Sequence, residues 1–145
     1  MVSDVVMTEH DCIGRVATAQ PAGFASYQMD SHSCQRVVMG GRAMNEGIVE
    51  YGGGFPTIDW RCLVPKRGEC PNLTVPVCIS ASHIAFGSLR MEPVFMVLGQ
   101  SAATLSALAL ARGCAVQDVP FHELAHLLQA DGQILTWDHG ERFFK

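Results

Sequence analysis

The longest apolar stretch of the chain runs from Pro93 to Ala111 and contains no charged side chain. Pro93 suits the first position of a helix, where the N–H that proline lacks is not needed. Gly113 suits the left-handed residue that ends many helices. The pattern therefore predicts one long buried helix over residues 93–112, with charged residues only at its two edges.

Two rows of this predicted helix differ in side-chain size. Bulky residues form one row: Phe95, Leu98, Leu105 and Leu108. Small residues recur every four positions on the other: Gly99, Ala103, Ala107 and Ala111. Missing side chains allow another backbone, or a flat cofactor, to come into contact. Helix packing is the simpler explanation of the small row, and a cofactor is the alternative.

The same stretch has the length of a membrane span, which needs ~20 apolar residues. The lack of a flanking basic cluster argues against a membrane span. Four polar side chains within the stretch also argue against it: Gln100, Ser101, Thr104 and Ser106. We therefore expect a buried helix of a soluble protein and no membrane partner.

The first 80 residues contain short apolar runs and short stretches in which residue types alternate, a pattern typical of strands. We predict strands over 2–7, 24–32 and 72–80, with a loop at 21–23. The strand at 72–80 has the strongest pattern, although Pro76 places it at an edge or an irregularity. Glycine clusters between residues 37 and 65 predict an antiparallel meander. In the strand at 24–32, Asp30 and His32 share one face.

A shorter helix is predicted over residues 120–130, between Pro120 and Gly132. Its expected buried face holds Leu124, Leu127 and Leu128. The tail, 136–145, carries no usable motif. The fold class is therefore α+β: a small, mostly antiparallel sheet, then the long helix and the shorter one. We expect a single domain over 1–145, divided into strands at 1–80, a loop and helices at 81–135, and the tail.

Composition narrows the classes of function. The 145 residues are 48% hydrophobic and 17% charged, which supports one core. A formal charge of -4 and the absence of a basic cluster exclude a nucleic-acid partner on electrostatic grounds. The first residues lack a signal sequence, so we expect a cytoplasmic protein. The six cysteines are too widely spaced for a structural zinc site and are expected to be buried free thiols.

Residues 122–126 spell His-Glu-Leu-Ala-His. On a helix, this spacing places His122 and His126 on one face as zinc ligands, with Glu123 as the base that activates water. A catalytic zinc needs a third protein ligand, and the downstream candidates lie in the tail: Asp138, His139 and Glu141. A small zinc-dependent metallopeptidase is therefore the alternative function, and chance histidines on a surface helix are the preferred interpretation.

Several segments resemble the C-terminal part of the FAD-dependent oxidoreductases, in order along residues 1–135. They are DSHSCQRVV, NEG, LVPKRGECPNLTVPVCISASHIAFGSLRMEPVFMVLGQSAATLSALAL and VQDVPFHELAHLLQADGQIL. The resemblance implies a flavoprotein of the glutathione-reductase-like type, in which a G-x-G-x-x-G turn holds the FAD pyrophosphate. No such motif is present here. We expect a fragment of an FAD/NAD(P)-binding fold that is inactive alone.

The resemblance also implies roles for particular residues. FAD is the expected cofactor, contacted by a segment around the start of the long helix: Met91, Gly99, Gln100, Ser101, Ala102 and Ala103. His83 as proton donor and Arg90 as anion-orienting group are the expected catalytic residues toward a small-molecule substrate. Weaker candidates come from the strand region: Asp30, His32 and Arg36. The plainer alternatives are an Arg90–Glu92 ion pair and a hydrogen-bonded loop histidine.

Such a fragment should expose apolar surface where the missing domain packs. The expected partner is the missing N-terminal FAD-binding segment or a second copy of the chain.

Overall fold

The computed structural model describes residues 1–52 and 54–136 and shows an α+β fold, as the sequence predicts. Its elements are α1 (Glu9–Cys12), β1 (Pro21–Phe24), β2 (Met29–Ser31), β3 (Gln35–Met39), β4 (Arg42–Glu46), β5 (Val49–Tyr51), β6 (Thr57–Asp59), η1 (Trp60–Leu63), α2 (His83–Leu89), α3 (Glu92–Arg112), η2 (Val116–Asp118) and α4 (Phe121–Ala130). The strands in the described residues form three two-stranded antiparallel sheets: β1–β6, β2–β5 and β3–β4.

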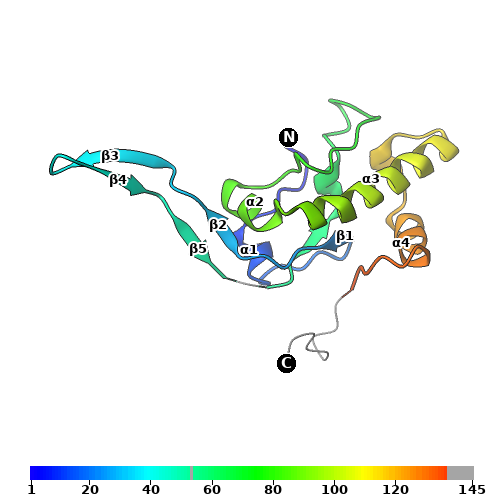
Figure 1. Ribbon diagram of the computed structural model, residues 1–145. Helices are drawn as coiled ribbons and strands as arrows, with labels where there is room; N and C mark the ends of the chain where they lie inside the picture. The colour runs from blue at the N-terminus through cyan, green and yellow to red at the C-terminus, as the bar shows by residue number, and fades with distance from the viewer. Residues whose placement is uncertain (53, 137–145) are drawn as a thin grey trace, which may run out of the picture.

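Helix α3 confirms the long helix predicted over residues 93–112. It ends at Gly113, which adopts the left-handed conformation with φ 61° and ψ 36°. One face packs on β1, η1, η2 and α4 (Figure 1). The buried residues on that face are Val94, Leu98, Ser101, Ala102, Leu105 and Ala109.

The opposite face of α3 is not covered by the described residues. This uncovered face consists of Met96, Gly99, Ala103, Ala107 and Leu110. Met96 is 75% and Leu110 83% exposed, and a Cβ added at Gly99 would meet no atom within 4 Å. The small row therefore packs against nothing within the described chain. By length and composition alone α3 could cross a membrane, although 33% of its apolar window is buried.

Strand β1 occupies the segment that the sequence predicted as a loop, so that prediction is wrong. β1 pairs with β6 and lies against α3, where Ala22 is fully buried. A Cβ added at Gly23 would lie 2.6 Å from Val97 Cγ1, and Ser101 Oγ donates to the Ala22 carbonyl at 2.7 Å. The small residues of β1 thus serve close packing with the helix.

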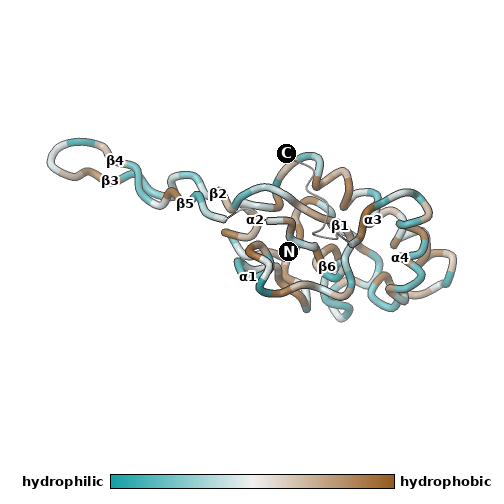
Figure 2. The backbone as a smooth tube through the Cα atoms, turned by 90° about the horizontal axis from the view of Figure 1, so that it is seen from below, coloured by the Kyte–Doolittle hydropathy of each residue, from teal (hydrophilic) through white to brown (hydrophobic). Residues whose placement is uncertain are grey.

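Residues 29–51 form a two-tier hairpin that projects from the body of the molecule (Figure 1, Figure 2). The inner tier is the β2–β5 pair and the outer tier is the β3–β4 pair. The turn between β3 and β4 contains Gly40 and Gly41, which have φ of 57° and 75°. The predicted turn at Gly40 and Gly41 is confirmed, but the predicted meander is wrong, because β5 pairs with β2 and β6 pairs with β1 instead of with the strands before them. Of the strand predicted over 24–32, only residues 29–31 form a strand of their own, β2, and Phe24 is the last residue of β1 in a different sheet.

Two other predicted strands, at 2–7 and 72–80, are absent. Met7 makes only an isolated parallel bridge with Ala81, and its N–H donates to the Ser80 carbonyl at 2.9 Å. In the second segment, the Val75 N–H donates to the Leu63 carbonyl at 2.7 Å instead of to a neighbouring strand. Pro76 has no N–H to offer, so a regular ladder cannot form through it.

Helix α4 confirms the second predicted helix, and Gly132 follows it with φ 81°. Leu124 and Leu128 are buried, but Leu127 is 38% exposed, so the predicted buried face is wrong at that position.

All six cysteines are free, as expected. Cys12 and Cys62 are buried, and burial raises the pKa of Cys62 to about 12. Cys34 and Cys78 are exposed, contrary to the expectation of burial.

Asp59, at the end of β6, is the most heavily bonded buried carboxylate in the described chain. Its oxygens accept from the Arg61 N–H at 2.9 Å, Arg61 Nη2 at 2.7 Å and Thr18 Oγ1 at 2.5 Å. Burial alone would raise the pKa of Asp59, but the hydrogen bonds from Arg61 and Thr18 outweigh burial and lower it.

We expect this carboxylate to make the fold acid-sensitive. A pKa lowered by folding contributes stability that is present above the unfolded value, about 3.9, and is lost as the pH falls through the folded value. Asp59→Asn should cost about 1–3 kcal/mol at pH 7, and less at pH 3. Urea unfolding of both proteins between pH 3 and 7 measures the difference, and a difference independent of pH would contradict this account.

Candidate functional site

The first candidate site is a cavity of about 330 Å³ between β2 and α2, here called the polar cavity. Its lining residues are Asp30, Ser31, His32, Ser33, Cys34, His83, Phe86, Gly87 and Arg90. The structure therefore brings together the two residues that the sequence put forward as catalytic, His83 and Arg90. They lie at the two ends of α2, a helix that the sequence analysis had treated as a loop.

Helix α2 forms here because Ser82 caps it: its side chain accepts from the Ala85 N–H at 3.3 Å. The helix is held tightly against β2. A Cβ added at Gly87 would lie 2.5 Å from the Asp30 carbonyl oxygen, and Ser88 Oγ donates to the Tyr27 carbonyl at 2.5 Å. Only glycine permits this approach, which brings α2 side chains within reach of β2.

Asp30 connects the charged groups of the polar cavity. Its Oδ2 lies 3.3 Å from Arg90 Nη2 and 3.2 Å from His32 Nε2, so Asp30 and His32 share one face as predicted. The residue is 9% exposed, and its buried Oδ1 has no hydrogen-bond partner in the described chain. The alternative in which Arg90 pairs with Glu92 is not what the structure shows, because Arg90 pairs with Asp30.

Ser31 contacts two other residues that line the polar cavity, His83 and Cys34. Its Oγ lies 2.8 Å from His83 Nε2 and 3.7 Å from Cys34 Sγ. The imidazole can therefore exchange a proton with a ligand while the hydroxyl fixes one of its nitrogens. The sequence analysis did not propose Ser31 or Cys34 as site residues, although both lie in the segment DSHSCQRVV that carries the family resemblance. Ser31 lies between Asp30 and His32, and Cys34 lies two positions after His32.

Arg36, the weakest candidate, lies elsewhere. It belongs to β3 on the outer tier of the hairpin, where its Nε donates to Asn45 Oδ1 at 3.1 Å. It does not line the polar cavity. The sequence analysis grouped it with Asp30 because both lie in the strand region of the family resemblance.

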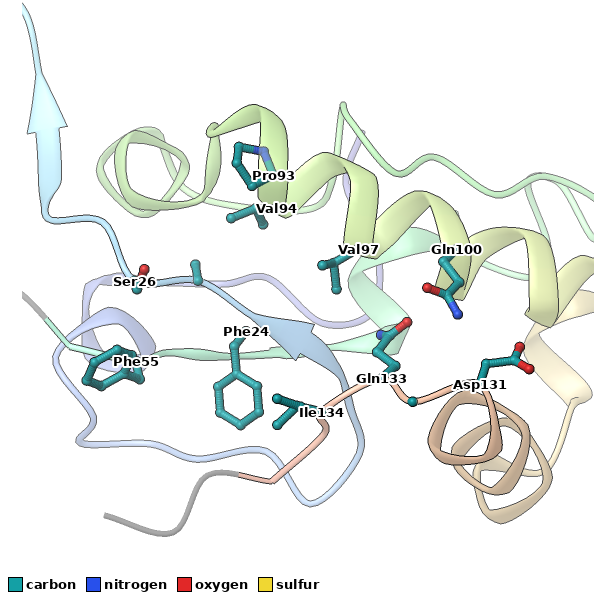
Figure 3. A pocket seen from close by; sticks show the side chains of 12 residues that line it. Phe24, Ser26, Phe55, Pro93, Val94, Val97, Gln100, Asp131, Gln133 and Ile134 are labelled. Carbon is teal, nitrogen blue, oxygen red and sulfur yellow. The ribbon is translucent and has the colours of Figure 1, made fainter. Parts of the chain in front are cut away.

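A second cavity, of about 520 Å³, lies along the first half of α3 and is here called the apolar cavity (Figure 3). It is lined by Phe24, Ala25, Ser26, Phe55, Pro93, Val94, Val97, Gln100, Asp131, Gly132, Gln133 and Ile134. Val97 and Gln100 point from α3 toward Phe24, Gln133 and Ile134. Segments far apart in the sequence thus form one concave surface.

The six expected flavin contacts do not lie on one surface. Five of them are consecutive on α3, where each residue is turned by 100° from the one before, so they point in different directions. Gln100 lines the apolar cavity. Ser101 and Ala102 are buried in the core face. The other expected contacts, Gly99 and Ala103, lie on the uncovered face, and Met91 is partly buried just before α3.

The apolar cavity fits a flat, mostly apolar ring with polar edges, such as a flavin. Phe24, Val97 and Ile134 supply apolar walls. Gln133 Nε2 donates to Ser101 Oγ at 2.7 Å and to the Ala22 carbonyl, whereas its buried Oε1 has no partner in the described residues. Gln100 therefore leaves polar atoms for a ligand beside the apolar walls, whereas Gln133 contributes to the wall and its amide is buried or already bonded.

The His-Glu-Leu-Ala-His segment lies on the outside of α4. The His122 side chain is 82% exposed, and His126 is exposed as well. Both oxygens of Glu123 accept from Arg112 Nη1, at 2.7 and 2.9 Å. No three potential metal ligands come together within residues 1–52 and 54–136. The possible third ligands (Asp138, His139, Glu141) lie outside the described residues.

A family model described as FAD dependent oxidoreductase matches residues 1–128, which include both cavities except for residues 131–134. No curated protein and no solved structure matches the chain significantly.

Proposed function

The chain belongs to the FAD-dependent oxidoreductase family, and we propose that it forms the flavin-ring and substrate-side part of a glutathione-reductase-like enzyme. FAD is the cofactor of this family. In this proposal the apolar cavity receives the flavin ring and the polar cavity receives a small substrate.

The observation that carries this proposal is the position of the two cavities on either side of the turn between α2 and α3. Arg90 lines the polar cavity and Pro93 lines the apolar cavity. These residues are three positions apart in the sequence, so their Cα atoms lie within about 11 Å of each other. A ligand in one cavity is therefore near a ligand in the other.

Each group has a definite task in this arrangement. Bound FAD supplies the acceptor for a pair of electrons. Arg90 orients an anionic group of the substrate, and His83 gives or takes the proton that accompanies the transfer. Gln100 binds a polar edge of the flavin, while Phe24 and Val97 exclude water from its ring.

We further propose that a separate segment carries the G-x-G-x-x-G turn for the FAD pyrophosphate, since this sequence lacks that motif. The uncovered face of α3 supports this, because apolar side chains such as Met96 and Leu110 are exposed there. Gly99 and Ala103 leave room on that face for FAD or for the segment that holds it. A second copy of the chain is the alternative partner.

The proposal predicts that the isolated chain binds the flavin ring weakly and that the rest of FAD adds no affinity. At about 0.3 kcal/mol per non-hydrogen atom, a ring of about 19 such atoms has a Kd on the order of 0.1 mM. Titrations with riboflavin and with FAD, followed by flavin fluorescence, should therefore give similar affinities. Gln100→Trp should abolish binding, because the indole fills the cavity.

Two control variants test the location. Leu110→Trp places the same side chain on the exposed part of α3 and should leave riboflavin binding unchanged. His122→Gln combined with His126→Gln should also leave it unchanged. If Gln100→Trp binds riboflavin as well as the native chain, the flavin is not in the apolar cavity. If FAD binds about 100-fold tighter than riboflavin, the chain holds the pyrophosphate itself and needs no other segment.

A further inference from the structure

We infer that the polar cavity binds a small carboxylate, and that Asp30 and Ser31 are positioning residues that hold Arg90 and His83 for it. The inference rests on the proposed function in treating this cavity as the substrate side. It adds a chemical class of ligand and two residues that the sequence analysis did not give these roles.

Arg90 is held at one nitrogen only. Its Nη2 contacts Asp30 Oδ2 at 3.3 Å and the Asp30 carbonyl oxygen at 3.5 Å. Within the described residues, Nε and Nη1 make no hydrogen bond, and the side chain is 36% exposed. A guanidinium with free donors in a fixed plane is the group that best binds a carboxylate with two parallel hydrogen bonds.

The charges around the polar cavity also favour an anion. Three lining side chains carry or can carry positive charge, Arg90, His32 and His83, and Asp30 is the one carboxylate among the lining residues. Asp30 is 9% exposed and its Oδ2 is already engaged by Arg90 and His32. An entering carboxylate therefore meets exposed donors, while the resident negative charge is buried and paired.

Ser31 holds His83 in position, as Asp30 holds Arg90. The hydroxyl is 2.8 Å from His83 Nε2, and Ser31 is 7% exposed, so the residue is fixed in the wall of the cavity. The contact restricts the ring to one orientation and assigns one nitrogen to the hydroxyl. Asp30 and Ser31 are consecutive on β2, so one short strand sets the position of both α2 groups.

The volume limits the size of the ligand. At about 330 Å³, the polar cavity lies at the lower end of the range for ligand sites, which starts near 300 Å³. A small organic acid fits this space, and a dinucleotide does not.

The test uses the whole chain, with propionate as the probe and propionamide as its uncharged counterpart. Side-chain NMR signals of Arg90 and His83 should shift with propionate and not with propionamide. Arg90→Gln should abolish the response. Asp30→Asn should weaken propionate binding at least tenfold although Arg90 is intact, and Asp30→Glu should recover part of it.

A merely structural role for Ser31 or Asp30 would not give these results. Ser31→Ala should change the NMR signals of the His83 ring nitrogens, because the contact at Nε2 is lost, and Ser31→Thr should restore them. Arg36→Gln, an exposed arginine on the hairpin, should bind propionate as the native chain does. The inference is overturned if propionamide binds as well as propionate, if propionate does not bind, or if folded Asp30→Asn binds it with native affinity.

The two proposals fail in different ways. Propionate binding by a chain that binds no riboflavin would remove the proposed function and leave the carboxylate site standing. Riboflavin binding without propionate binding would remove the carboxylate site and leave the flavin assignment standing. Both titrations use the same native protein, so misfolding cannot explain either outcome.

Discussion

Leu98→Ala is expected to lower the free energy of unfolding by about 2–5 kcal/mol, the usual cost of a cavity in a closed core. Leu98 is fully buried on the face of α3 that packs against β1. Its Cδ2 would lie 3.8 Å from a Cβ added at Gly23, so the strand is too close for the gap to collapse without movement. Urea unfolding of the native and variant chains measures the change.

Leu110→Ala is the matched control, because Leu110 lies on the same helix and is 83% exposed. Its effect should stay within about 0.5 kcal/mol, as for other surface substitutions. A comparable loss in both variants would show that α3 is covered on both faces in solution, and would contradict the division into a core face and an uncovered face.

Gly87→Ala is expected to have the second largest effect, and to act on the site as well as on stability. The added Cβ would lie 2.5 Å from the carbonyl oxygen of Asp30 and 3.1 Å from its backbone N and C atoms. Backbone atoms cannot turn aside as a side chain can, so α2 must move away from β2. We expect a cost of about 1–3 kcal/mol or more, measured by urea unfolding.

The same movement should separate the paired groups of the polar cavity. His83 would lose Ser31, and Arg90 would lose Asp30, so propionate binding should fall together with stability. Gly99→Ala is the control: its Cβ meets open space within a helix, and the change should stabilise by about 0.5–1 kcal/mol. Equal stability of the native chain and Gly87→Ala would mean that α2 and β2 are less tightly packed than described.

The elements that the sequence predicted well are those with local signals. The ends of α3 follow from Pro93 and Gly113, whose backbone preferences act within one turn of helix. Glycine pairs likewise marked the tip of the hairpin at Gly40 and Gly41. These signals depend on neighbours along the chain, so they can be recognised without knowledge of the packing.

Strand predictions failed where the partner decides the structure. The segments 2–7 and 72–80 have strand-like composition but bond to each other and to η1 at isolated points. The β1 segment looked like a loop because its residues are small, and they are small because α3 packs on them. Strand propensity reflects packing against neighbours more than a backbone preference, so composition alone misleads.

The candidate site shows the same division. The sequence by itself determined the family resemblance and the long helix, and it put forward His83 and Arg90 as candidates. Only the tertiary structure decided that Arg90 binds Asp30, which is 60 positions away, rather than Glu92. Residues two apart do not face each other along a helix, whereas Gly87 lets β2 come within contact of α2. Partners brought together by such long-range packing leave no local pattern, so no reading of the sequence could have placed Ser31 beside His83.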